Sequence, residues 1–187
     1  MEKQSTTVIN AKAVRFTVWL IIVAIIMMFA GLTSAYIVRK AEGNWTMFEL
    51  PSRFIFSTVS ILISSLTLHW SHSQAKKGNS KKQMIGVWIS LVLGTLFLIL
   101  QWKSFGQLVD QGVFLTGNPS GGFLYIITGL HGLHIFAGLV WMLVIILGVN
   151  SKINQSLNVL RSSLCLTYWH FVDILWIYLF IFLILNH

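Results

Sequence analysis

Charged side chains are scarce in this sequence of 187 residues. They make up 10% of it, against 56% for hydrophobic residues, and only five of them are acidic. Soluble domains carry about 25% charged residues, so this composition excludes an ordinary soluble domain. We therefore expect an integral membrane protein.

Cysteine is nearly absent, and so is any sign of a second domain. The single cysteine, Cys165, excludes a disulfide within the chain and any metal site that needs two thiolates. No internal repeat indicates a transporter built from two related halves. The longest connection between apolar runs, residues 106–122, is polar and rich in glycine. One domain, 1–187, is expected.

Long apolar runs are what the sequence has instead. Five of them, at 19–38, 54–70, 84–102, 123–149 and 162–186, are long enough to cross a ~30 Å hydrocarbon layer. They are continuous rather than alternating, which favours helices over a barrel. The sequence thus predicts an all-α polytopic bundle with spans at approximately 14–38, 53–72, 83–105, 122–149 and 161–186. The first run is too long for a cleaved leader, so we expect it to be retained.

The net charge of +8 reflects topology rather than a nucleic-acid site. Nine of the 13 basic residues fall on one predicted side: Lys3, Lys12, Arg15, Lys76, Lys77, Lys81, Lys82, Lys152 and Arg161. The other side has Arg39, Lys40, Arg53 and Lys103. The positive-inside rule then predicts a cytoplasmic amino terminus and an outer carboxyl terminus.

Four ionisable side chains lie inside the last two predicted spans, where a charge costs at least ~2.5–3.5 kcal/mol on insertion scales. His131 and His134 belong to TGLHGLHIFAG, residues 128–138, and His170 and Asp173 belong to YWHFVDILW, residues 168–176. Each pair shares one face of its helix at about 100° per residue. In antiparallel neighbours these two faces can meet, which would give the carboxylate a partner.

Three roles compete for this polar cluster: ligation of a metal or haem, relay of protons, and cross-linking of helices. Two stacked haems need histidines about four turns apart on each of two helices, whereas His131 and His134 are one turn apart. A proton relay needs titratable groups that extend toward both surfaces, and the first and third spans offer almost none. The residues by themselves favour a structural cluster that fixes the register of the last two helices. A b-haem electron carrier and a small transporter stay open as alternative functions.

The same segments resemble a known family. YIITGLHGLHIFAG, residues 125–138, resembles the TGxHGxHV segment of subunit III of the haem–copper oxidases. YWHFVDILWIYLF, residues 168–180, resembles the family's YWHFVDxxW segment. Weaker matches are MFAGLTSAY at 28–36, LGTLFLILQW at 93–102 and the basic loop at 75–83. The resemblance covers essentially the whole chain, and five helices match the short form of the family.

The resemblance implies a non-redox subunit of a cytochrome c or quinol oxidase in a bacterial cytoplasmic membrane. Oxidase subunits I and II, membrane lipids and a larger respiratory assembly are the implied partners, without nucleic acid. The resemblance implies that haems and copper belong to the partner subunits. For this chain it implies bound phospholipid, but no cofactor, metal ligand or catalytic residue. The residues expected to form a structural polar cluster or a lipid contact are His131, His134, Tyr168, Trp169, His170 and Asp173.

Two positions depart from the family pattern. Ile25 stands where the family's SExMFFAG segment often has a glutamate, and Ser104 stands where its QxxEY pattern has an acid. A role in proton uptake that depends on those carboxylates is therefore not implied for this chain.

Overall fold

The computed structural model describes residues 2–43, 45, 53–150 and 155–186, and within them it contains helices and no strand. The helices are α1 (Glu2–Ala41), α2 (Arg53–Lys76), α3 (Ser80–Asp110), α4 (Pro119–Asn150) and α5 (Gln155–Asn186). All five are long and apolar enough to cross a membrane. A helix satisfies its backbone hydrogen bonds internally, as lipid requires. The predicted all-α bundle with five membrane-spanning helices is confirmed.

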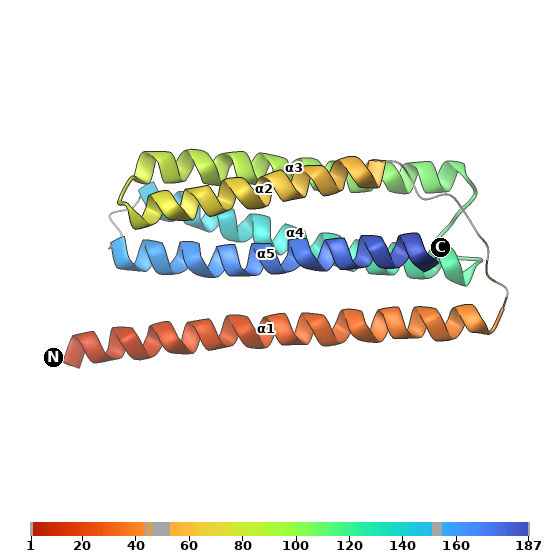
Figure 1. Cartoon of the computed structure of the whole chain (residues 1–187), viewed down its shortest axis with the longest axis horizontal. Helices are drawn as coiled ribbons and strands as arrows, with labels where there is room; N and C mark the ends of the chain where they lie inside the picture. The colour runs from red at the N-terminus through yellow and green to blue at the C-terminus, as the bar shows by residue number, and fades with distance from the viewer. Residues whose placement is uncertain (1, 44, 46–52, 151–154, 187) are drawn as a thin grey trace.

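Four of the helices form a bundle, and α1 lies to one side of it (Figure 1). Within the bundle α2 packs on α3 and α5, and α4 packs on the same two helices, whereas among the described residues α1 contacts only α4 and α5. Two hydrogen bonds join the carboxyl ends of α1 and α5. The Tyr36 hydroxyl and the Lys40 ammonium donate to the carbonyl oxygen of Asn186, at 2.9 and 2.6 Å. The two helices therefore run parallel.

The helices are longer than the apolar runs that predicted them. Helix α1 has 40 residues, which corresponds to about 60 Å at 1.5 Å per residue, twice the ~30 Å hydrocarbon layer. Hydropathy marks only the part of a helix that lipid surrounds, because backbone hydrogen bonding continues into the polar region. The limits of the spans stay a prediction.

Serine side chains join α2 to α3. The hydroxyls of three buried serines on one face of α2 donate to backbone carbonyls of α3: Ser60 to Leu93 (2.9 Å), Ser64 to Ser90 (2.9 Å) and Ser71 to Gln83 (2.7 Å). The helices approach closely at Gly86, where a Cβ would come within 2.6 Å of the Ser71 Cβ. Small residues and interhelical hydrogen bonds hold helices together in lipid, where no hydrophobic force does so.

Large apolar side chains cover the outer surface of the bundle. Among the most exposed are Met27, Leu66, Leu147 and Leu185, each at least 70% exposed. Side chains of this kind face lipid rather than water in a membrane bundle. The interior of the bundle holds Trp169, Trp176, Phe97 and other aromatic residues that are fully buried.

Candidate functional site

Trp169 occupies the centre of the bundle, with glycine on two sides. A Cβ at Gly138 of α4 would lie 2.8 Å from two carbons of the indole ring, and a Cβ at Gly94 of α3 would lie 2.8 Å from a third. The ring thus fills a space between α3 and α4 that exists only because both positions lack a side chain. Of the predicted site residues, Trp169 is the one that contacts both of these helices through glycine.

His170 and Asp173 lie beside α2. The Nδ1 atom of His170 is 2.5 Å from the Ser65 hydroxyl, and its ring centroid is 5.8 Å from that of His69. Ser65 also lies beside the Asp173 carboxyl group. Neither carboxyl oxygen makes a hydrogen bond of regular geometry with a described residue. Asp173 is buried, and Ser65 places it beside α2.

Tyr168 and His134 join α5 to α4 through the backbone. The Tyr168 hydroxyl donates to the carbonyl oxygen of His134 at 3.0 Å. The Nδ1 atom of His134 is 2.7 Å from the carbonyl oxygen of Leu130 in its own helix, and its ring meets the edge of Phe29 of α1 at 5.7 Å. The imidazole of His134 therefore lies against α1 and its own helix.

Three aromatic rings surround His131. Its ring stacks on Trp176 of α5 with 5.1 Å between centroids and 28° between planes. The rings of Phe29 and Phe97 meet it edge-on at 6.4 and 5.9 Å. Neither ring nitrogen makes a hydrogen bond to a described residue, and the side chain is fully buried. Packing rather than hydrogen bonding positions this histidine.

Five of the six predicted residues therefore fall into three groups, and the sixth, Trp169, packs on the glycines of α3 and α4. One group connects α5 to α2 through His170 and Asp173, a second connects α5 to α4 through Tyr168 and His134, and His131 lies among aromatic rings. The sequence indicated that the polar faces of the last two helices can meet and give the Asp173 carboxylate a partner. The neighbour that the described contacts give this carboxylate is Ser65 of α2, and one structural cluster of all six residues stays a prediction. Helix α5 turns His170 and Asp173 toward α2, and its Tyr168 toward α4.

The structure also shows how the chain fills the positions that depart from the family pattern. Ile25 is buried in the core that α1 shares with the bundle. Ser104 is buried in α3, and its hydroxyl donates to the Leu100 carbonyl oxygen at 2.9 Å. In the described part of the chain, no three His, Cys, Asp or Glu side chains gather as a metal site would require.

Some residues that organise this region were not predicted. Ser65 contacts both His170 and Asp173, and Gly94 makes room for Trp169. The serines of α2 that bond α3 follow at intervals of four and seven, which is a helical face and was visible in the sequence. Which neighbour that face meets depends on the arrangement of the helices.

Comparison with known proteins gives a consistent result. A family model described as cytochrome c oxidase subunit III matches residues 2–186. Cytochrome c oxidase subunit 3 of Bacillus sp. (strain PS3) is 30% identical over 168 residues, which cover 87% of this chain and 80% of that protein. A probable cytochrome c oxidase subunit 3 of Nocardia farcinica is 32% identical over 162 residues, covering 83% and 79%. Cytochrome bo(3) ubiquinol oxidase subunit 3 of Pseudomonas aeruginosa is 28% identical over 170 residues, covering 88% and 81%.

Proposed function

The chain belongs to the cytochrome c oxidase subunit III family, and we propose that it is the non-redox accessory subunit of a proton-pumping terminal haem–copper oxidase. Such oxidases reduce oxygen to water, and the relatives are named as subunits of both cytochrome c and quinol oxidases. The observation that carries the proposal is the match of the family model to residues 2–186. The five apolar helices and the bacterial relatives make the chain an integral protein of a bacterial cytoplasmic membrane.

The surroundings of the histidines support a structural rather than a redox role. A haem or copper ligand needs a ring nitrogen aimed at the metal, with room for the metal beyond it. His131 is enclosed by aromatic rings from α1, α3 and α5. The Nδ1 atom of His134 is engaged with its own helix. In this proposal the haems and copper belong to subunits I and II.

The interior contacts support a role as a rigid body that docks on subunit I. Helix α5 contacts α1, α2 and α4, and its Trp169 fits between glycines of α3 and α4. The proposed role of the six predicted residues is to fix α5 at the centre, so that the apolar outer faces keep one shape for a partner and for bound lipid. Packing of this density changes shape only at a high cost in free energy.

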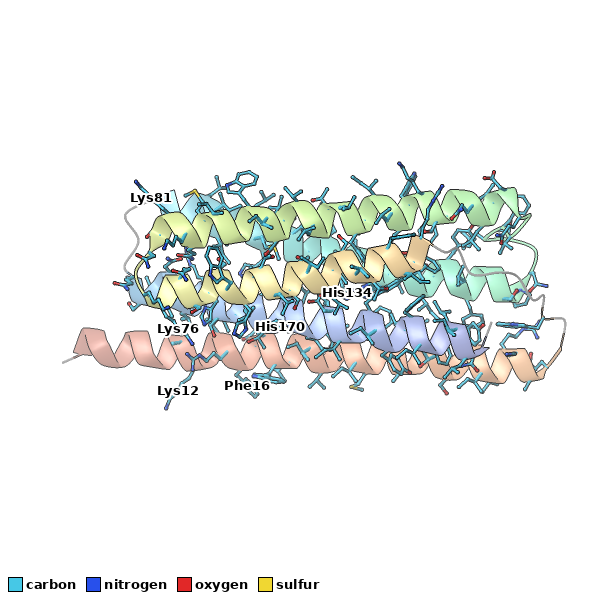
Figure 2. All side chains as sticks on the ribbon, turned by 45° about the horizontal axis from the view of Figure 1, so that its top comes forward. Lys12, Phe16, Lys76, Lys81, His134 and His170 are labelled. Atoms are coloured by element: carbon cyan, nitrogen blue, oxygen red, sulfur yellow. The ribbon has the colours of Figure 1, made fainter. Side chains whose placement is uncertain are left out.

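The proposed orientation places the amino terminus in the cytoplasm. Lys12, Lys76 and Lys81 lie at the same end of the molecule (Figure 2), which fits the excess of basic residues on the cytoplasmic side of membrane proteins. Green fluorescent protein fused to the amino terminus is then expected to fluoresce. The same protein fused to the carboxyl terminus would be exported to the outer side and is expected not to fluoresce. The reverse pattern would contradict this orientation.

Copurification tests the proposed function. The tagged chain, extracted in a mild detergent, is expected to bring down oxidase subunits I and II together with haem absorption, and an untagged membrane preparation serves as the control. A partner with a paired-cysteine copper domain would identify cytochrome c as the electron donor. Recovery of the chain without any haem-containing partner, from membranes with oxidase activity, would contradict the proposal.

A further inference from the structure

A cavity of about 600 Å³ lies where α2 begins and α3 ends. Its volume is in the range of about 300–1,000 Å³ that ligand pockets occupy. Its lining includes Arg53 at the start of α2 and, on α3, Trp102, Lys103, Gln107 and Asp110. None of the six residues discussed above lines it. The cavity is therefore separate from the core of the bundle.

Two cations converge on this cavity. Arg53 donates from Nη1 to the carbonyl oxygen of Lys103 at 3.0 Å, which holds the guanidinium group against α3. The only ion pair among the described residues joins Arg39 to Glu42, so neither Arg53 nor Lys103 is neutralised by a described carboxylate. Both residues line the cavity, and an arginine and a lysine that line one cavity are suited to bind a phosphate group.

Hydrogen-bond acceptors lie next to these cations. Lys103, Gln107 and Asp110 follow at intervals of four and three residues, so they share one face of α3. The Oε1 atom of Gln107 is buried and accepts no hydrogen bond from a described residue. The cavity thus offers positive charge at Arg53 and Lys103, and hydrogen-bond acceptors at Gln107 and Asp110, one to two turns further along α3.

Trp102 shows where the cavity lies relative to lipid. Its side chain lines the cavity and is 78% exposed. Tryptophan at the end of a spanning helix marks the level of the lipid headgroups. A ligand at this level with a phosphate group is most simply a phospholipid.

We propose that this cavity binds the headgroup of phosphatidylethanolamine. The phosphate lies at Arg53 and Lys103, and the primary ammonium group donates to Asp110 and to Oε1 of Gln107. Each charge of the headgroup then meets the opposite charge, whereas a headgroup that is only anionic leaves Asp110 without a cation. The inference deepens the lipid-binding part of the proposed function, and the proposed orientation places the site in the outer leaflet.

Native mass spectrometry of the full-length chain in detergent tests the proposal. After delipidation, the chain is offered dioleoylphosphatidylethanolamine or dioleoylphosphatidylcholine, which has the same phosphate and acyl chains but no N–H donor. We expect one phosphatidylethanolamine to bind about tenfold more tightly, because one charge-assisted hydrogen bond contributes about 1.4 kcal/mol. Equal affinity for the two lipids would overturn the assignment of the amine.

Variants locate the binding. The double variant Arg53→Gln, Lys103→Gln is expected to hold one lipid fewer, while the control double variant Lys76→Gln, Lys77→Gln at the opposite end keeps the wild-type number. Asp110→Asn is expected to remove the preference for phosphatidylethanolamine. Unchanged lipid binding by the first double variant, or complete displacement of lipid by inorganic phosphate, would overturn the proposal.

The copurification experiment distinguishes a failure of the lipid-site proposal from a failure of the proposed function. Circular dichroism of each variant verifies that the helices are intact. If a variant loses lipid selectivity as expected but still copurifies with haem-containing partners, both proposals stand. If the wild-type chain shows no selectivity but copurifies, only the lipid site is wrong.

Discussion

The indole ring of Trp169 packs on Gly138 so closely that a Cβ at that glycine would lie 2.8 Å from two ring carbons. The ring comes from α5 and the glycine from α4, so a single contact sets the distance between these helices. Gly94 of α3 meets the same ring. The spacing of α3, α4 and α5 therefore depends on the Trp169 ring and on the absence of a side chain at Gly94 and Gly138.

Gly138→Ala is expected to destabilise the bundle. The added methyl group cannot fit unless the Trp169 ring or a helix moves, and overpacking of this kind costs about 1–3 kcal/mol. Thermal unfolding in detergent measures the effect. The control is Gly129→Ala on the same helix, where a Cβ would meet nothing within 4 Å. Equal stability of the two variants would show that the close contact is not needed.

Ser64→Ala is expected to weaken the association of α2 with α3. It removes the hydroxyl that donates to the Ser90 carbonyl oxygen at 2.9 Å, and interhelical hydrogen bonds in membrane proteins contribute about 0.6 kcal/mol on average, with a maximum near 1.7. Unfolding in sodium dodecyl sulfate measures the loss. Thr95→Ala is the matched control, because the exposed Thr95 hydroxyl donates to the Leu91 carbonyl oxygen of its own helix. A larger loss in the control would contradict this account.

The sequence predicted the five helices because hydropathy reports directly on lipid contact. It did not predict the role of Ser60, Ser64 and Ser71. The residue type alone does not show whether a serine hydroxyl donates to a carbonyl oxygen of another helix or of its own helix. Spacing showed that these serines share a face, but not that the face meets α3. The same limit applies to Asp173, because the rotation of α5, which brings this acid beside Ser65 of α2, depends on all of its neighbours.

His131→Leu is expected to leave stability unchanged or to raise it slightly. A buried polar group without a partner costs about 1–3 kcal/mol, and loss of the stack on Trp176 offsets about 0.5–1.5 kcal/mol of that gain. His170→Leu is the comparison, because His170 has a hydrogen-bond partner in Ser65. The same unfolding measurement ranks the two. A greater loss in His131→Leu than in His170→Leu would mean that His131 has a polar partner.

Asp173→Ala is expected to weaken assembly of the oxidase, and turnover should fall only in proportion to the complex lost. The substitution leaves a cavity between α5 and α2 and takes a neighbour away from Ser65. Asp173→Asn keeps the shape of the side chain and is the matched control, which should assemble normally. Yield of intact complex and proton uptake per complex are the measurements. A fully assembled Asp173→Ala complex that no longer takes up protons would contradict a structural role.

The absorption spectrum of the chain, taken after separation from its partner subunits, tests the central claim most directly. The account predicts no Soret band and no stoichiometric iron or copper in the separated chain, with all of the haem in the partner fraction. A Soret band that stays with the separated chain and disappears in His131→Ala would contradict it.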